Sequence, residues 1–543
     1  MGRRTLCLSL LAPVTATLVV FGSGACRRKP ARTVPARVTI LYTGGVQGTL
    51  EPCGCSPGQL GGIARIATLV KQVRDETGAV VLVDAGNLLF QEAEVPASLR
   101  EQLLMKAHFL QKAYGAMRVA VLNLGEHDLP GGPELPLRGA EEIGAVSVSS
   151  NLFRASAKRR TLTRAATIVN AGGARVAFIG AMAPGSLAGA VKETLRVEDP
   201  LNRVRVTVAQ VRAEADVVVL LSTLGLAADR RLAAHVPGLD LVIDAGVRGE
   251  PHNVVIPEKA GGSLIVQVKT LGEYVGRIDI APRSGETGGL RDATTSDRVR
   301  GLPAEEGAAG GGITFGKGLE LRGAPERKRV APFGAFPPLA PGTLRHTVYA
   351  VADRFAQDAG IQRLMNEYKS RVADLNRKAS TTTSRIPTAG PTYVGEDSCK
   401  ECHQEIYDFV HTTAHAHAYE TLERKQSEFD LECVGCHVAG WRKPGGFDQP
   451  AAVGNLKNVQ CEVCHGPASR HVREEGDLNN VGGFRAAVPI ETCRTCHTQE
   501  LGTRFAGNEA AYMDRIRCSR AILAGGPTPS GSVQPRSRGA AAP

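Results

Sequence analysis

Four copies of a five-residue pattern, Cys-x-x-Cys-His, lie in the last third of the chain. They read CKECH, CVGCH, CEVCH and CRTCH, at Cys399–His403, Cys433–His437, Cys461–His465 and Cys493–His497. In each copy, two thiols can add across the two vinyl groups of one porphyrin, and the adjacent histidine can bind its iron. The pattern therefore predicts four covalently attached haem c groups. The attachment thiols would be Cys399, Cys402, Cys433, Cys436, Cys461, Cys464, Cys493 and Cys496, and the proximal iron ligands His403, His437, His465 and His497.

Zinc is the alternative for such cysteine pairs, because Cys-x-x-Cys also builds zinc ribbons and fingers. Zinc-binding pairs typically recur about 12–20 residues apart. The gaps from Cys402 to Cys433, from Cys436 to Cys461 and from Cys464 to Cys493 are all longer. A zinc site also does not require a histidine directly after every second cysteine. The pattern therefore favours haem.

Each haem iron takes a sixth ligand or keeps an open position for a substrate. The remaining histidines of the region are His411, His415, His417 and His471, and Met513 is its only methionine. We therefore expect mostly bis-histidine coordination, with lower potentials than His/Met sites. Residues 403–423 read as one helix leaving the first motif, with His411 and His415 on one face and His417 roughly opposite. A surface polar role is the alternative for each of these histidines, above all for His411.

Upstream of this region, short apolar runs alternate with amphipathic stretches from about Val38 to Pro282. Runs such as VTILYTG, AVVLVDAG, VAVLNLG, RVAFIGAM, VVVLLS and LDLVIDAG predict buried strands. The stretches Gly62–Val73, Leu99–Tyr114, Leu201–Ala213 and Ala227–His235 predict helices. Strands alternating with helices indicate an α/β domain, and LIVQVKT and YVGRIDIAP would close it as a hairpin. Helical spacing returns from Tyr349 to Asn376.

The first 26 residues are typical of an export signal. Arg3 and Arg4 precede an apolar stretch, Thr5–Phe21, and small residues lead to Cys26. This ending resembles a bacterial lipobox, which would make Cys26 a lipid anchor, although Ser23 stands where leucine is usual. Simple cleavage after Ala25 and an uncleaved anchor are the alternatives. We expect a periplasmic or lipid-anchored bacterial protein, because c-type haem is attached outside the inner membrane.

The chain has 543 residues and a net charge of +11. This length predicts more than one domain. The positive charge is spread along the chain, without a basic block interleaved with aromatics, so we expect periplasmic or membrane redox proteins as partners and no nucleic acid. Outside the motifs, Cys53 and Cys55 could bind a soft metal, act in redox chemistry, or be structural, for example by pairing with Cys518.

The segments YTGGVQGTLEPCGC, GGIAR, VLVDAGNLL, NLGEHDL, VSSNL, LLSTLGLAADRRLA and DLVIDAGVRGE follow one another in this order. Together they resemble the calcineurin-like metallophosphatase domain of 5′-nucleotidases. The resemblance implies strand-end loops that hold two metal ions, which generate an attacking hydroxide. Most ligands of that pattern are replaced here. Gly45 and Gln47 stand for Asp-x-His, Asn87 for the bridging Asp and Thr223 for a His, residues 245–248 lack His, and His127 is kept. We therefore expect a non-catalytic domain, in which Asp84, Glu126, His127 and Asp128 hold at most one weakly bound ion or simply cap loops.

The segments YVGEDSCKECHQEIYDF, TTAHAHAYETL, ECVGCHVAGW, VQCEVCHGPASRHV and CRTCHT resemble multihaem cytochromes of the cytochrome c-554 type. The resemblance implies a protein that shuttles electrons between periplasmic partners, with His415 or His417 and His471 as distal ligands. Related chains often carry a histidine near the position of Cys518. One haem of this chain would then be bound by Cys518, bound by Met513 or open.

The sequence thus predicts a multidomain protein, an α/β metallophosphatase-like sandwich followed by a mainly helical, loop-rich tetrahaem cytochrome c domain. The expected segments are a signal peptide (1–26), the α/β domain (37–283), a linker (284–345), a connecting helix (346–379), the haem domain (392–518) and a disordered tail (519–543). The expected function is electron transfer between periplasmic or membrane-associated partners. A redox enzyme that acts on a small nitrogen or sulfur compound at an open haem is one alternative, and a residual metal-dependent phosphoesterase is the other.

Overall fold

The computed structural model describes residues 37–52, 59–156, 160–245, 258–268, 271–283, 289–294, 299–300, 336–381, 390–448, 454–474, 482–498, 505 and 507–518. The predicted export signal with Cys26, the Cys53 and Cys55 pair, and the predicted tail lie outside the described residues. The described residues from 37 to 518 form one compact unit. Within the described residues, no helix combines the length and the apolar character needed to cross a membrane.

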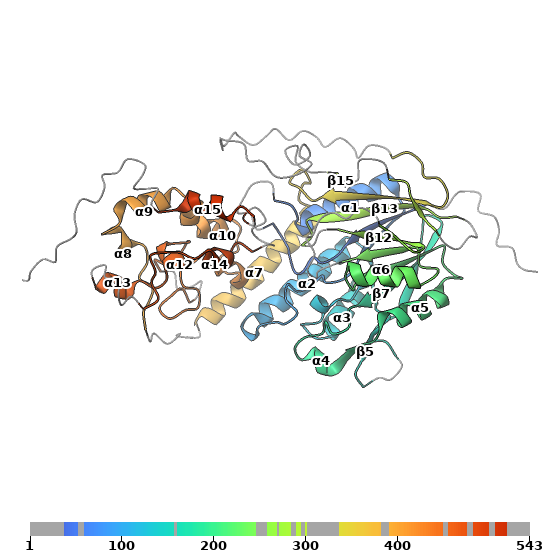
Figure 1. Ribbon diagram of the computed structural model, residues 1–543, viewed down its shortest axis with the longest axis horizontal. Helices are drawn as coiled ribbons and strands as arrows, with labels where there is room; N and C mark the ends of the chain where they lie inside the picture. The colour runs from blue at the N-terminus through green and yellow to red at the C-terminus, as the bar shows by residue number, and fades with distance from the viewer. Residues whose placement is uncertain are drawn as a thin grey trace, which may run out of the picture. The chain divides into compact units, whose positions relative to one another are not determined.

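The N-terminal part is an α/β sandwich built on two sheets (Figure 1). Over the described residues, the first sheet has eight strands in the order β14-β16-β13-β1-β2-β3-β4, with β15 also paired to β16. Strands β1 to β4 run parallel, while β13 is antiparallel to both β1 and β16. The bounds are β1 Val38–Thr43, β2 Val80–Asp84, β3 Val119–Asn123, β4 Val146–Val148, β13 Tyr274–Ala281, β14 Arg291–Asp292, β15 Val299–Arg300 and β16 Thr343–Ala350.

The second sheet has six strands over the described residues, in the order β11-β12-β10-β9-β7-β6. Its central strands β7, β9, β10 and β12 are parallel, and β6 and β11 pair antiparallel at the two edges. The bounds are β6 Ala166–Ala171, β7 Ala174–Met182, β9 Val217–Thr223, β10 Leu241–Asp244, β11 Glu258–Ala260 and β12 Ser263–Gln267. A separate short pair joins β5 (Leu152–Arg154) to β8 (Leu195–Val197).

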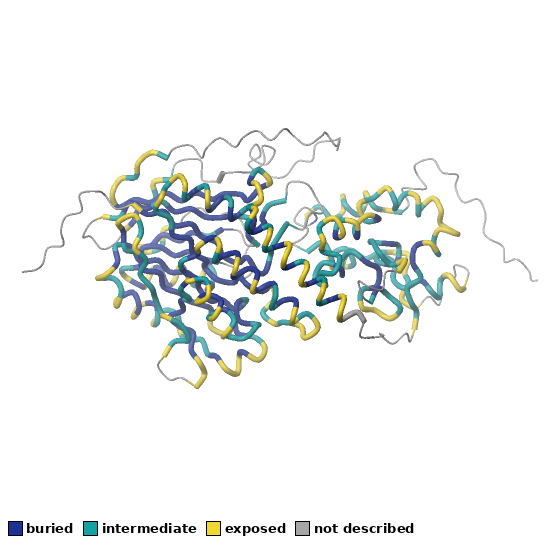
Figure 2. The backbone as a smooth tube through the Cα atoms, turned by 180° about the vertical axis from the view of Figure 1, so that it is seen from behind, coloured by how far each residue is buried: buried dark blue, intermediate teal, exposed yellow. Residues whose placement is uncertain are grey.

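Alternation along the strands builds the core on both faces of each sheet. Ile40 and Tyr42 of β1 lie in a cluster between the two sheets, together with Phe178 of β7, while Leu41 lies in the cluster beneath the helices. A period of two places successive side chains on opposite faces. The strands are accordingly buried along most of their length (Figure 2).

Amphipathic helices cover the outer faces of the sheets. Helices α1 and α2 pack on the first sheet, and α5 and α6 pack on the second. Helix α5 begins where Asp199 accepts hydrogen bonds from the backbone N–H groups of Leu201 and Asn202, with Pro200 in the first turn, a sequence that favours helix initiation. The bounds are α1 Ile63–Thr77, α2 Arg100–Ala116, α3 Glu134–Glu142, α4 Val191–Thr194, α5 Pro200–Val211 and α6 Leu226–His235.

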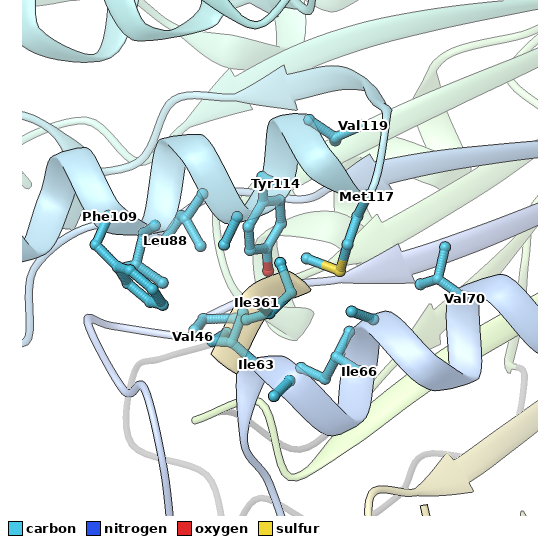
Figure 3. Close-up of a cluster of buried hydrophobic side chains, with 14 of the residues drawn as sticks. Val46, Ile63, Ile66, Val70, Leu88, Phe109, Tyr114, Met117, Val119 and Ile361 are labelled. Atoms are coloured by element: carbon cyan, nitrogen blue, oxygen red, sulfur yellow. The ribbon is translucent and has the colours of Figure 1, made fainter. Parts of the chain in front are cut away.

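The long helix α7 (Ala359–Thr381) belongs to the core of the α/β part. Ile361 lies among Val46, Ile63 and Tyr114 in a buried cluster (Figure 3). The predicted helix at 346–379 is therefore wrong in its first part, because β16 occupies Thr343–Ala350. Two further expectations are corrected: the predicted linker contributes β14 and β15, and the predicted hairpin is not formed, since β12 and β13 belong to different sheets.

The C-terminal part consists of short helices joined by loops (Figure 1). The single helix predicted over residues 403–423 is broken into α9, η3 and α10. The hydroxyls of Thr412 and Thr413 donate to the backbone carbonyls of Phe409 and Val410 and end α9. The bounds are α8 Asp397–Lys400, α9 Gln404–His411, η3 Ala414–His417, α10 Ala418–Arg424, α11 Leu431–Val434, α12 Cys461–His465, α13 Ser469–Arg473, α14 Ile490–Arg494 and α15 Glu509–Ile516.

Candidate functional site

Each Cys-x-x-Cys-His motif begins on one of the single-turn helices α8, α11, α12 and α14. In the first and fourth motifs the histidine N–H donates to the carbonyl of the leading cysteine, as His403 to Cys399 and His497 to Cys493, both at 2.9 Å. Residues three and four apart share one face of such a turn. The winding therefore brings two thiols and one imidazole to the same side, which a covalently tethered haem requires. No disulfide joins the motif cysteines in the described part of the chain, and Cys402 is exposed while the others are partly exposed.

Two motif histidines face a second histidine from elsewhere in the chain. The ring centres of His403 and His471 lie 6.5 Å apart with their planes at 11°. The ring centres of His415 and His497 lie 6.1 Å apart with their planes at 60°. A metal–nitrogen bond is about 2 Å long, and the ring centre lies roughly 1 Å beyond the nitrogen, so two imidazoles on opposite sides of one iron have centres about 6 Å apart. Both pairs fit a six-coordinate haem iron.

The other two motif histidines are oriented by backbone carbonyls. His437 Nδ1 lies 2.6 Å from the carbonyl oxygen of Ala418, and His465 Nδ1 lies 2.7 Å from that of Arg485. Because a carbonyl only accepts, Nδ1 is the donor and Nε2 is left for a metal, as is usual for metal-binding histidines. Among ring contacts of the described residues, none brings another histidine to His437 or His465.

His411 and His417 do not approach a motif histidine in the described part of the region. His411 stacks on Tyr407, with ring centres 4.1 Å apart, and its Nε2 lies 3.3 Å from Glu396 Oε1. His417 is exposed, and its two ring nitrogens lie 3.2 Å from Glu420 Oε1 and from the carbonyl of His411. The break after α9 separates His415 from His411, whereas His417 lies with His415 in η3.

Burial favours the neutral form of several of these imidazoles by lowering their pKa. It lowers the pKa of His437 and of His497, and it lowers the pKa of His415, to which the nearby His497 adds a smaller effect. Only the neutral imidazole can bind a metal. The environment therefore favours the protonation state that iron ligation needs.

Two phenylalanines that the sequence pattern did not reveal pack on candidate ligands. Phe484 stacks on His471 with ring centres 4.5 Å apart, and Phe505 stacks on His497 at 4.8 Å. No spacing rule connects these positions to the motifs. Of the two sulfur candidates, Met513 Sδ lies 3.4 Å from Cys493 Sγ. Burial raises the pKa of the Cys518 thiol, and the nearby Cys461 adds to that effect.

The second motif is held against the α/β part by a buried polar network. Lys106 of α2 pairs with Glu432 of α11, with Nζ 2.6 Å from Oε2, and Gln102 Nε2 donates to Asp430 at 2.7 Å. Asn376 of α7 donates to Gln102 and to the carbonyl of Phe429. The leading residues of the second motif are thus fixed by two helices of the sandwich.

The strand ends of the α/β part carry polar residues that mostly bond to one another. Asp128 accepts hydrogen bonds from the backbone N–H groups of Asn87, Leu88, Leu89 and Gly125. Asp84 accepts from Thr43 at 2.6 Å, and burial raises the pKa of Asp84 to about 7. Gly86 has φ +113°, and a Cβ added there would meet Thr223 Cγ2 at 2.7 Å. Over the described residues, no three His, Cys, Asp or Glu side chains converge as metal ligands would.

The structure describes most of the positions at which the metallophosphatase pattern has metal ligands. Glu126, His127 and Asp128 form the short helix η2, in which Glu126 and Asp128 are buried. Asn87 uses its side-chain oxygen to accept from the His127 N–H at 3.0 Å. Ser222 donates to Asp229 at 2.7 Å. Gly45 and Gln47 are described in the loop after β1, whereas residues 246–248 lie outside the described residues.

Comparisons with known proteins agree with this division of the chain. The family model for cytochrome c554 and c-prime matches residues 398–466. Cytochrome c-554 of Nitrosomonas europaea is 28% identical over 160 residues, a match that covers 24% of this chain and 68% of that protein.

The α/β part matches other proteins. An uncharacterized metallophosphoesterase of Bacillus subtilis, YunD, is 31% identical over 84 residues, and the match covers 16% of this chain and only 18% of YunD. The solved structure of a 5′-nucleotidase precursor from Thermus thermophilus aligns with 76% of this chain and 72% of its own, with 17% identity and a TM-score of 0.44. The chain is therefore similar to cytochrome c-554 in its C-terminal region, and it shares a stretch of 84 residues with a metallophosphoesterase.

Proposed function

We propose that this chain is an exported tetrahaem c-type cytochrome that carries electrons between periplasmic or membrane-associated redox proteins. The observation that carries the proposal is the pairing of His403 with His471 and of His415 with His497. The ring centres of the two pairs are 6.5 and 6.1 Å apart. An iron with two strong ligands has no open position. Such a centre is suited to accepting and releasing electrons rather than to binding a substrate.

The ligand assignment follows from these pairs. The first haem would be tethered by Cys399 and Cys402 and held between His403 and His471. The fourth would be tethered by Cys493 and Cys496 and held between His497 and His415. The second and third would be tethered by Cys433 and Cys436, and by Cys461 and Cys464, with His437 and His465 as their proximal ligands.

Haem supplies reversible one-electron chemistry when it is bound. The chain's own residues tether it, orient the imidazoles and shield them. The carbonyls of Ala418 and Arg485 fix the rings of His437 and His465, and Phe484 and Phe505 cover those of His471 and His497. Zinc is the weaker interpretation, because a zinc site does not require a histidine directly after the second cysteine of all four motifs.

Adjacent histidines offer a matched test of the assignment. His415 faces His497, whereas His417 is exposed and bonded to Glu420. In electron paramagnetic resonance spectra of the oxidised holoprotein, His415→Ala should convert one low-spin haem to high spin, and His417→Ala should leave the spectrum unchanged. An equal effect of both substitutions, or of neither, would contradict the assignment.

A redox enzyme is the second candidate, and the surroundings of His437 and His465 favour it. Neither ring faces another histidine among the described residues, so one of these irons is a candidate for an open position. A high-spin ferric component of about one haem, perturbed by added nitrite or sulfite, would support catalysis on a small nitrogen or sulfur compound. A fully low-spin spectrum would remove this candidate.

A residual phosphoesterase activity has weaker support. The carboxylates of Asp84 and Asp128 already accept internal hydrogen bonds, while a two-metal hydrolase needs several free donors around its ions. Manganese-dependent hydrolysis of a generic phosphate ester by the holoprotein would restore this candidate.

Membrane attachment through a lipid on Cys26 is part of the proposal of an exported cytochrome. A Cys26→Ser substitution that releases the protein from the membrane fraction would support it.

A further inference from the structure

Glu462 is a buried carboxylate inside the third attachment motif, CEVCH. The residue is 1% exposed. Its carboxylate accepts hydrogen bonds from the backbone N–H groups of Val394 at 3.0 Å, Gly395 at 2.8 Å and Ala468 at 2.8 Å. Burial raises the pKa of Glu462, and the three backbone donors act in the opposite direction. A buried charge is tolerated when its hydrogen bonds are made.

The three donors belong to segments that lead to the first haem. Val394 and Gly395 directly precede Glu396, the residue at the start of α8, which carries Cys399. The neighbouring Gln460 strengthens the link, because its Oε1 accepts from the Glu396 N–H at 3.1 Å. The thiols of Cys399 and Cys461 are near enough to shift each other's pKa, downward for Cys399 and upward for Cys461. The first and third motifs therefore lie side by side and are fastened by adjacent side chains.

The third donor connects the same carboxylate to a candidate iron ligand. Ala468 is the N-terminal cap residue of α13, which carries His471. The His471 ring faces His403 at 6.5 Å with near-parallel planes. One carboxylate thus contacts the run into the first motif, the third motif and the helix that presents His471.

From these contacts we infer that Glu462 is a positioning residue, which sets the His403–His471 ligand pair of the first haem and its placement beside the third haem. The inference rests on the proposed tetrahaem assignment. Glu462 does not touch iron in this scheme. It acts through the backbone of the segments that carry the two ligands.

Glutamine cannot replace the carboxylate at this position. Oε1 accepts from Ala468 and Oε2 accepts from Gly395, so an amide must turn its NH₂ group toward one of these N–H donors. The amide NH₂ group would then face the N–H group of Gly395 or of Ala468, which leaves that buried N–H without an acceptor and displaces its segment. Either displacement moves His403 relative to His471. The His415–His497 pair does not share these contacts and provides an internal reference.

The test compares Glu462→Gln with Glu491→Gln in the full-length holoprotein. Glu491 is the matched control, because it lies in the helix of the fourth motif and its side chain is 71% exposed. The mass of each protein counts its haems, and the paramagnetic resonance spectrum and the redox titration report their ligation. For Glu462→Gln we expect four attached haems, loss of the low-spin signal of one haem and one shifted potential. Glu491→Gln should match the wild type.

A Glu462→Gln spectrum and titration identical to the wild type would overturn the inference while leaving the tetrahaem assignment intact. A wild-type protein without four haems would instead overturn the assignment. If Glu462→Gln does not yield holoprotein, the paramagnetic resonance spectrum of Glu462→Asp tests the inference instead. Aspartate keeps the charge but withdraws the oxygens by one methylene, so an altered first-haem signal supports the inference and an unaltered one refutes it.

Discussion

The Lys106→Met substitution should destabilise the haem region, although Lys106 belongs to the α/β part. Lys106 Nζ lies 2.6 Å from Glu432 Oε2, and the two side chains are 10% and 21% exposed. Burial alone would lower the pKa of Lys106, but Glu432 and Asp430 outweigh it and raise the pKa. Methionine fills a similar volume without the charge, so the partly buried carboxylates of Glu432 and Asp430 lose their cationic partner.

The expected loss follows from the geometry. At 2.6 Å, Coulomb's law with an effective dielectric constant of 20 gives a gross attraction of roughly 6 kcal/mol. Desolvation offsets part of this, and breaking one partner of a buried pair typically costs about 3–5 kcal/mol. We expect a loss within that range in the free energy of unfolding. The double variant Lys106→Met, Glu432→Gln should recover much of it, because it removes the stranded charge.

Urea unfolding of the holoprotein, followed by the haem absorbance and by circular dichroism, measures this loss. Lys112→Met is the matched control, since Lys112 lies exposed on the same helix, where substitutions usually change stability by about 0.5 kcal/mol or less. If Lys106→Met shifts the haem transition no more than Lys112→Met does, the second motif is not held by α2 in solution. The reasoning from the buried pair would then be refuted.

Three other outcomes are expected. Burial raises the pKa of Asp84 to about 7, so the stability that this carboxyl contributes is full below its unfolded pKa near 4 and is lost as the pH rises through about 7. The unfolding temperature of Asp84→Asn should therefore change less between pH 4 and pH 7 than that of the wild type. If the unfolding temperatures of the two proteins change in parallel with pH, the raised pKa of Asp84 is contradicted. Asp128→Asn places an amide NH₂ group against backbone N–H groups that now donate to the carboxylate, so it should lower the free energy of unfolding by about 1–3 kcal/mol. An unchanged free energy in urea unfolding would count against this network. His471→Ala should convert one haem to high spin and leave the His415–His497 signal in place; loss of both low-spin signals would show that the two pairs are not independent.

The sequence was most informative where the chemistry is local. Each attachment motif spans five residues, so its two candidate thiols and its candidate proximal histidine could be named without tertiary information. The α/β layering was also predictable, because the period-two strands and the amphipathic helices alternate along the chain. The predicted helices near Gly62, Leu99, Leu201 and Ala227 are confirmed as α1, α2, α5 and α6.

Long-range pairing limited the prediction. The segment TLRHTVYA forms β16, whose polar residues Arg345 and His346 are buried beside β13. No local sequence pattern predicts that this segment pairs with β13. His415 and His417 are only two residues apart, and the fold alone shows that His415 faces His497 whereas His417 contacts Glu420. Glu462 is one of two variable positions within its motif, so its hydrogen bonds to Val394 and Ala468 become visible only in the fold.

The mass of the intact, exported holoprotein tests the central claim most directly. Four thioether-bound haems predict a polypeptide heavier by four haem groups, with all eight motif cysteines resistant to thiol alkylation. Alkylation of both cysteines in any motif, or a mass that falls to the bare polypeptide under denaturing conditions, would contradict the tetrahaem account.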